Sequence, residues 1–238
     1  MNLISFKKFS MTVLGVLALG LHLGMTLWGT DEKGLPVTGH PLAIALLAVT
    51  VLACAVALLG SRIRKAPARY VRDTSSPAAA ALGCFAMAGG IAVTVISGFG
   101  TGLRLELIRD LCGIGAVPVL IALGLIRFSE KKSFFLLHTF VCIYLTLHTV
   151  SHYQIWSSTP QWLHWLFPMA ASVTLTLFSY YRTAFAANMG NLQMQYVSGL
   201  LALFFCVGAI ASQGGMLYLG GAVWTLTNLC NPQQEACQ

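Results

Sequence analysis

Charged residues are scarce in this chain. Only 9% of its 238 residues are Asp, Glu, Lys or Arg, whereas 57% are hydrophobic. A soluble domain carries about 25% charged residues, so this chain lacks the polar surface that a protein in water needs. Apolar runs of about 20 residues recur, the length of a helix that crosses a bilayer. The composition predicts a multi-pass protein of the cell membrane, with residues 1–238 forming a single integral membrane domain and the lipid bilayer as its main partner.

Several catalytic and metal-binding motifs are also missing. The sequence has no H-E-x-x-H, which argues against a zinc protease, and its seven cysteines form no C-x-x-C. Scattered cysteines inside apolar runs behave as small hydrophobic residues and predict no disulfide framework. The glycines at positions 98, 100 and 102 follow no predicted strand, so they do not indicate a nucleotide-binding loop. We assign no catalytic residue and favour a non-enzymatic role.

Apolar runs define eight predicted spans. Unbroken apolar runs lack the alternation of a membrane barrel, so helices are expected and the fold class is all-α, a polytopic helical bundle. The last segment is short. If it does not cross the membrane, the protein has seven membrane-spanning helices. Small residues at every fourth position of the third span predict close packing at the centre of the bundle. The spans are Phe9 to Trp28, Pro41 to Gly60, Pro77 to Gly98, Leu105 to Ile126, Phe134 to His152, Trp162 to Tyr181, Tyr196 to Ser212 and Met216 to Cys230.

The basic residues are distributed unevenly between the two sets of loops. If the N-terminus is cytoplasmic, eleven of the fourteen Lys and Arg residues fall on the cytoplasmic side. Cytoplasmic loops carry such an excess, so the bias predicts this orientation. The most basic segment, Arg62 to Arg72, is predicted to contact anionic lipid. The membrane thus accounts for the formal net charge of +7, and we expect no nucleic acid as a partner.

The fourth span begins with charged residues that lie deep. The uncharged run Leu111 to Ile126 has 16 residues and covers about 24 Å, so a full span includes Arg109 and Asp110 and reaches towards Glu106. The i,i+3 spacing allows Arg109 to neutralise Glu106. Ionisable residues at membrane depth are candidate substrate-binding residues, although a solvated helix start is the simpler alternative.

The histidines gather towards the predicted outer side. His148 and His152 are four residues apart, so they share a helix face and could hold one metal ion, with His22, His164, Glu106 or Asp110 as a further ligand. A haem would instead need histidines at equal depth on facing helices, such as His22 and His148. The alternatives are a polar cavity or a pH-sensitive role, and rings that simply sit at the headgroup level. In the cavity, His22 and His148 would be candidate substrate-binding residues with Glu106, Arg109 and Asp110.

Three stretches resemble a known group of sequences. They are "GLPVTGHPLA" (34–43), "HYQIWSSTPQWLHWLFPMAASV" (152–173) and "AVWTLTNLC" (222–230). In these stretches the chain resembles uncharacterised polytopic membrane proteins of anaerobic gut bacteria. The resemblance implies a membrane-embedded helical protein and supplies no catalytic residue or cofactor.

Three functions remain open at this point. The preferred one is small-solute transport or a membrane-embedded binding subunit, because Pro118 can kink the fourth helix and the last hairpin can hinge at Gly214 and Gly215. It requires no cofactor. The second is a membrane enzyme or redox protein that holds a metal or haem at the outer histidines. The third is a non-catalytic sensor or assembly subunit that acts through a partner subunit.

Overall fold

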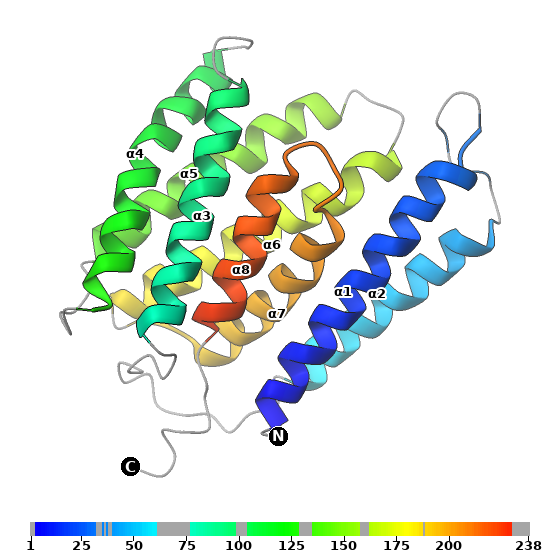
Figure 1. Cartoon of the computed structure of the whole chain (residues 1–238), viewed down its shortest axis with the longest axis horizontal. Helices are drawn as coiled ribbons and strands as arrows, with labels where there is room; N and C mark the ends of the chain where they lie inside the picture. Colours follow the sequence, from blue (N-terminus) through cyan, green and yellow to red (C-terminus); the bar gives the residue numbers. More distant parts are fainter. Residues whose placement is uncertain are drawn as a thin grey trace.

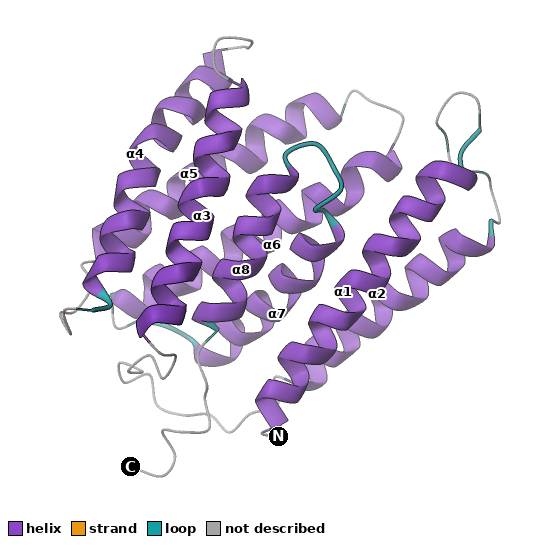
Figure 2. Cartoon of the chain, in the orientation of Figure 1, coloured by secondary structure: helices purple, strands orange, loops and turns teal. Residues whose placement is uncertain are grey.

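The predicted helices are present. A computed structural model describes residues 3–31, 35, 37, 40–60, 77–98, 104–128, 135–157, 162–187 and 189–229. In these ranges the regular elements are eight α-helices (Figure 2). The basic segment Arg62 to Arg72 lies outside the described residues. The helices are α1 (Leu3–Trp28), α2 (Pro41–Gly60), α3 (Pro77–Gly98), α4 (Arg104–Ile126), α5 (Phe135–Trp156), α6 (Trp162–Ala186), α7 (Leu192–Gly208) and α8 (Gly215–Asn228).

Five of the eight helices in the described ranges have the length and apolar character of membrane spans. Within the described ranges, α1 to α5 are long and apolar enough to cross a membrane, while α7 is apolar but shorter. The exterior is rich in large apolar side chains, such as Ile44 and Leu47 on α2 and Ile96 on α3. In water such a surface would favour association, whereas against lipid it is stable. The protein is therefore a helical-bundle membrane protein.

Contacts near the helix ends show that consecutive helices alternate in direction. The start of α1 meets the end of α8, because Lys8 Nζ donates to the Leu229 carbonyl at 2.9 Å. The start of α3 lies at the same place, since Asn228 Nδ2 donates to the Ala80 carbonyl at 3.3 Å. Arg182, near the end of α6, also reaches Asn228. We call this end of the bundle the Arg182 end.

Other helix termini meet at the opposite end. Arg109 near the start of α4 lies beside Ser151 near the end of α5, and His22 near the end of α1 lies beside Gly208 at the end of α7. We call this end the Arg109 end. The predicted grouping of residues by depth, in which His22, Arg109 and His148 share one side of the membrane, agrees with these contacts.

Helix α8 lies in the middle of the bundle, against α3 on one side and against α6 and α7 on the other (Figure 1). A Cβ atom on Gly90 would lie 2.6 Å from the Met216 carbonyl oxygen, and one on Gly220 would lie 2.6 Å from that of Ala86. Only glycine permits this approach of two helix backbones. The predicted close packing of the third span is thus confirmed, and α8 is its partner.

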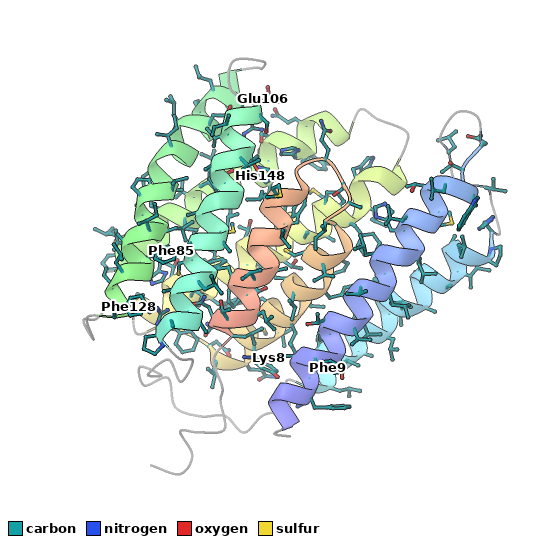
Figure 3. All side chains as sticks on the ribbon, in the orientation of Figure 1. Lys8, Phe9, Phe85, Glu106, Phe128 and His148 are labelled. Atoms are coloured by element: carbon teal, nitrogen blue, oxygen red, sulfur yellow. The ribbon has the colours of Figure 1, made fainter. Side chains whose placement is uncertain are left out.

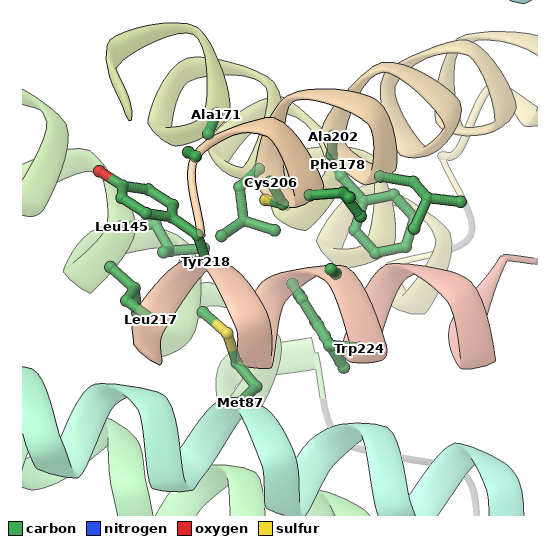
Figure 4. Packing of buried hydrophobic residues seen from close by; sticks show 14 of the residues in the cluster. Met87, Leu145, Ala171, Phe178, Ala202, Cys206, Leu217, Tyr218 and Trp224 are labelled. Atoms are coloured by element: carbon green, nitrogen blue, oxygen red, sulfur yellow. The ribbon is translucent and has the colours of Figure 1, made fainter. Parts of the chain in front are cut away.

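An apolar layer of Met87, Leu145, Phe178 and Trp224 lies between the two ends of the bundle. Figure 4 shows Met87 of α3, Leu145 of α5 and Phe178 of α6 gathered around α8. The rings of Phe178 and Trp224 meet edge to face, with centroids 5.2 Å apart. Within the described residues the five cysteines are free thiols, as their scattered positions predict.

The seventh helix begins and ends four residues earlier than predicted. Its start is set by Asn191, whose extended backbone and side chain cap the helix, with Oδ1 accepting from the Met194 N–H at 3.2 Å. After its last residue, Gly208, the chain turns, and Gly214 adopts φ +83° immediately before α8. That left-handed conformation favours glycine. The predicted turn at Gly214 is therefore present, but α7 ends before it and not at Ser212.

Helices α1 and α2 form a hairpin along one side of the bundle (blue and cyan in Figure 1). They contact the other helices chiefly through α7. The approach is close, because a Cβ on Gly15 would lie 2.9 Å from the Cβ of Val207. The hairpin leaves much of α2 facing outwards, in agreement with its many exposed apolar side chains.

Candidate functional site

A buried ion pair lies at the Arg109 end. Arg109 and Asp110 occupy the second turn of α4 and are only 5% and 1% exposed. Arg109 Nε donates to Asp110 Oδ1 at 2.8 Å, and Arg109 Nη2 lies 2.8 Å from the same oxygen. The arginine therefore turns back onto its sequence neighbour. The pair is enclosed by protein, in contrast to the solvated helix start that the sequence left open.

The end of α3 covers this pair. A Cβ on Gly98, the last residue of α3, would lie 3.2 Å from Arg109 Nη2 and 3.9 Å from Asp110 Oδ2. Glycine thus allows the backbone of α3 to approach the ion pair. Glu106 lies one turn earlier on α4, is half-buried, and is nearer the tip of the bundle than His148 (Figure 3).

Helix α5 contributes a row of polar side chains beside the pair. Ser151 Oγ accepts from Arg109 Nη1 at 3.5 Å and donates to the His148 carbonyl at 3.0 Å. The rings of His148 and His152 are close, with centroids 4.2 Å apart. Tyr144 lies one turn before His148 on α5, and its ring centroid is 6.1 Å from that of His148. We name this set the Arg109 cluster: Arg109, Asp110, Tyr144, His148, Ser151 and His152.

Two members of the Arg109 cluster have unsatisfied polar atoms. His148 is 2% exposed and Tyr144 is fully buried. Among the described residues, neither ring nitrogen of His148 nor the Tyr144 hydroxyl has a hydrogen-bond partner. Buried polar groups in proteins are normally hydrogen-bonded, and an unsatisfied one costs about 1–3 kcal/mol. Three such atoms on one face of α5, beside a buried ion pair, indicate a candidate binding site, although single unsatisfied atoms also occur elsewhere among the described residues, as at Tyr196.

Polar side chains continue from Tyr144 towards the centre of the bundle. Tyr144 packs on α4, where a Cβ on Gly113 would lie 2.9 Å from its Cε2 atom. Tyr144 interacts electrostatically with Arg109 and Asp110 and also with Tyr218 of α8. The Tyr218 hydroxyl is in turn hydrogen-bonded to Ser172 of α6 at 3.2 Å. The site thus extends from α4 and α5 to α8 and α6.

His22, which the sequence grouped with His148 by depth, contacts other helices. Its Nδ1 lies 3.5 Å from the Gly208 carbonyl oxygen at the end of α7, and its ring stacks on Phe167 of α6 at 5.3 Å. The ring contacts of His148 are with Tyr144 and His152 on its own helix α5, and it interacts electrostatically with Arg109 of α4. Depth therefore placed both histidines at the same end, but their contacts lie on different helices.

Among the described residues, the histidine pair is the part of the suggested metal site that the structure brings together. His148 and His152 are adjacent, as their spacing predicts. The described part of the chain contains no group of three or more His, Cys, Asp or Glu residues placed to hold one metal ion. The side chain of His164, a suggested further ligand, lies outside the described residues. The geometry described here therefore offers two of the three or four protein ligands that zinc requires.

A second polar cluster lies at the Arg182 end. Arg182 is 8% exposed, and its Nη1 donates to the Asn228 carbonyl at 3.0 Å and its Nη2 to Asn228 Oδ1 at 3.4 Å. Arg127 donates to the same Oδ1 at 3.4 Å. With Lys8 on the Leu229 carbonyl, three cations meet the C-terminal end of α8: one from α1, one from the turn after α4 and one from α6. Cations complement the negative end of a helix dipole. We name this set the Arg182 cluster: Lys8, Arg127, Arg182 and Asn228.

Sequence reasoning missed Tyr144 and Ser151 at the site. Both could have been found from spacing. Tyr144 is four residues before His148 and Ser151 is three residues after it, so both share a helix face with His148. Burial of Arg182 could not have been found in this way. Its main partner, Asn228, is 46 residues away, and the loop-charge rule places Arg182 at a membrane surface.

Comparisons with protein-family models, curated proteins and solved structures gave no significant match. The resemblance to polytopic membrane proteins of anaerobic gut bacteria therefore stays a prediction, and the function must be argued from the clusters.

Proposed function

We propose that this protein binds a small solute inside the membrane at the Arg109 cluster, as a small-solute transporter or a membrane-embedded binding subunit. The observation that carries this proposal is His148, which is buried with both ring nitrogens unsatisfied beside a buried ion pair. An arrangement of this kind reduces stability, and ionisable residues inside a membrane are typical of substrate and ion pathways.

The positions of the two clusters favour transport among membrane-embedded binding functions. The Arg109 and Arg182 clusters lie at opposite ends of the bundle, with the apolar layer between them. Helix α8 connects the two clusters. Tyr218, near its start, is one of the polar residues that continue from Tyr144 towards the centre of the bundle, and Asn228, at its end, accepts hydrogen bonds from Arg182. With 14 residues it covers about 21 Å. A solute bound near Tyr144 would thus already contact the helix that leads to the other end.

The proposal is tested with purified protein and a panel of sugars, polyols, amino acids and small amides. Thermal unfolding is measured with each solute, and uptake into proteoliposomes is then measured for those that raise the midpoint. A solute at 100 times its Kd should stabilise the protein by about 2.7 kcal/mol. His148→Phe should abolish the shift, because it removes both nitrogens and keeps a ring.

Tyr196→Phe is the matched control. Tyr196 lies on α7, is 2% exposed and also has an unsatisfied hydroxyl, but it is outside the Arg109 cluster. It should leave the shift unchanged. If no solute stabilises wild type in a His148-dependent way, binding at this cluster is wrong; binding without uptake would leave a binding subunit and exclude transport of that solute.

We further propose that the Arg182 end is cytoplasmic. Lys7, Lys8, Arg127 and Arg182 all belong to this end, whereas Arg109 at the other end is neutralised by Asp110. The charge asymmetry follows the positive-inside rule. A cysteine introduced as Ala66→Cys, within the predicted cytoplasmic loop, should resist a membrane-impermeant maleimide added to intact cells and react after lysis. Strong labelling of intact cells would reverse the orientation.

A further inference from the structure

The Arg109 cluster carries little net charge where a solute would bind. Arg109 places both Nε and Nη2 on one oxygen of Asp110, and both residues are buried. A buried ion pair of this geometry neutralises itself, and separating it in a medium of low dielectric constant costs several kcal/mol. A charged solute would have to break the pair or remain without a counter-charge.

The unsatisfied atoms lie deeper than the ion pair. Ser151, which contacts Arg109, lies near the C-terminal end of α5. His148 is three residues before it and Tyr144 seven residues before it, so they lie roughly 5 and 10 Å closer to the centre of the bundle. Beyond Tyr144 follow the apolar layer and the Tyr218–Ser172 hydrogen bond. A charge bound between His148 and Tyr144 would therefore lie on the apolar side of the pair, where its desolvation is most unfavourable.

The chemistry of the unsatisfied atoms is that of neutral hydrogen bonding. A neutral imidazole offers one donor and one acceptor, and a tyrosine hydroxyl offers both. The two rings share one face of α5, with centroids 6.1 Å apart and planes inclined by 29°. One polar group placed against this face can satisfy Tyr144 and one nitrogen of His148 together.

We infer that the solute is uncharged and presents to Tyr144 and His148 a group, such as a hydroxyl or a primary amide, that both donates and accepts hydrogen bonds. This inference rests on the proposed binding function, since it names the class of solute for the same site. Tyr144 and His148 bind the polar group, while Arg109 and Asp110 act as positioning residues that hold the ends of α4 and α5 together.

The test uses three probes of similar size and different charge: benzyl alcohol, benzoate and benzylammonium. Binding to the full chain in neutral-lipid nanodiscs is measured by saturation-transfer NMR, and empty nanodiscs correct for partitioning into lipid. Benzyl alcohol should bind more tightly than either ion. Tyr144→Phe should weaken its binding about 5- to 10-fold, the effect of one lost hydrogen bond, and Tyr196→Phe should leave it unchanged.

The outcomes separate this inference from the proposed function. If benzoate or benzylammonium binds more tightly and its binding is lost in His148→Phe or in the Arg109→Met, Asp110→Leu double variant, the solute class is wrong and the binding function stands. If no probe binds in a manner that depends on Tyr144 or His148, the inferred solute class fails, while the binding function is overturned only if the solute panel also gives no His148-dependent stabilisation. Tyr144→Phe keeps the buried ring, and a monodisperse size-exclusion profile with an unchanged unfolding midpoint verifies that the variant is folded.

Discussion

At the Arg109 end, the buried guanidinium is neutralised by the carboxylate next to it on the same helix. At the Arg182 end, the buried guanidinium donates to the carbonyl and side-chain oxygens of Asn228 on another helix. The first arrangement satisfies the charge locally and leaves His148 and Tyr144 on the neighbouring helix without partners. The second uses the charge to join α6 to α8.

The difference suggests a division of roles between the two ends. Bonds between distant helices stabilise one packing of the bundle, and the Arg182 cluster makes several of them around a single helix end. The unsatisfied buried atoms of His148 and Tyr144 instead reduce stability, and they lie beside a buried ion pair where a ligand could supply the missing bonds. The Tyr196 hydroxyl on α7 is also unsatisfied, but it lies outside the Arg109 cluster. The comparison therefore predicts that substitutions in the Arg182 cluster affect stability alone, whereas those in the Arg109 cluster can separate binding from stability.

The largest effect is expected for Asp110→Asn. It removes the only carboxylate bound to Arg109 by the contacts described here and leaves a buried, uncompensated cation. Breaking a buried ion pair in this way costs about 3–5 kcal/mol. Unfolding in SDS mixed micelles, followed by circular dichroism, measures the free energy of unfolding.

The control for this prediction replaces both partners. Arg109→Met combined with Asp110→Leu removes the two charges together, and such replacements are often neutral or stabilising. The double variant should therefore recover most of the lost stability. A double variant as unstable as Asp110→Asn would show that the pair's role is not the compensation of charge.

Arg182→Gln should have the second largest effect on stability. It loses charge-assisted hydrogen bonds to Asn228, each worth about 1.5–3 kcal/mol. Solute binding should be unaffected. Arg127→Gln is the comparison variant, because Arg127 is half-buried and should cost less. A loss of solute binding in a folded Arg182→Gln variant would contradict the division of roles between the two ends.

Much of the fold follows from the sequence because a bilayer imposes a length and a polarity on each span. The bounds of α2 and α3 agree with prediction, since prolines begin both helices and glycines end them. The fourth helix differs by one residue. The bounds of the seventh helix were predicted less accurately. Its start depends on a side-chain cap at Asn191, which lies in a polar segment outside the apolar run.

The depth of the site residues in the membrane could be predicted from the sequence, but the helices that they contact could not. The 16-residue uncharged run placed Arg109 and Asp110 below the surface, and both are buried. The same reasoning placed His22 and His148 at one level, but it does not tell which helices touch; His22 contacts α6 and α7. The i,i+3 spacing allows Arg109 to neutralise Glu106, but it did not indicate the ion pair that Arg109 forms with Asp110, the residue beside it. A long arginine side chain can reach back along its own helix, and spacing rules for helix faces do not describe this.

Glu106→Gln is expected to have a smaller effect than Asp110→Asn, although both replace a carboxylate by an amide on α4. Glu106 is half-buried, so solvent screens its charge, and the expected loss is about 1 kcal/mol or less. The same unfolding titration measures it. Equal losses for the two variants would mean that burial does not distinguish the two carboxylates.

Tyr144→Phe should have the smallest effect on stability while reducing solute binding. Because the Tyr144 hydroxyl is buried without a partner, its removal breaks no hydrogen bond within the described protein and relieves an unfavourable desolvation. The free energy of unfolding should therefore stay within about 0.5 kcal/mol of wild type or rise slightly. Tyr196→Phe should behave in the same way, since that hydroxyl is also unsatisfied. The two variants should then differ only in solute binding, because only Tyr144 belongs to the Arg109 cluster. A loss of more than about 1 kcal/mol in Tyr144→Phe alone would show that its hydroxyl is bonded in the protein itself, and the contrast between the two ends of the bundle would then disappear.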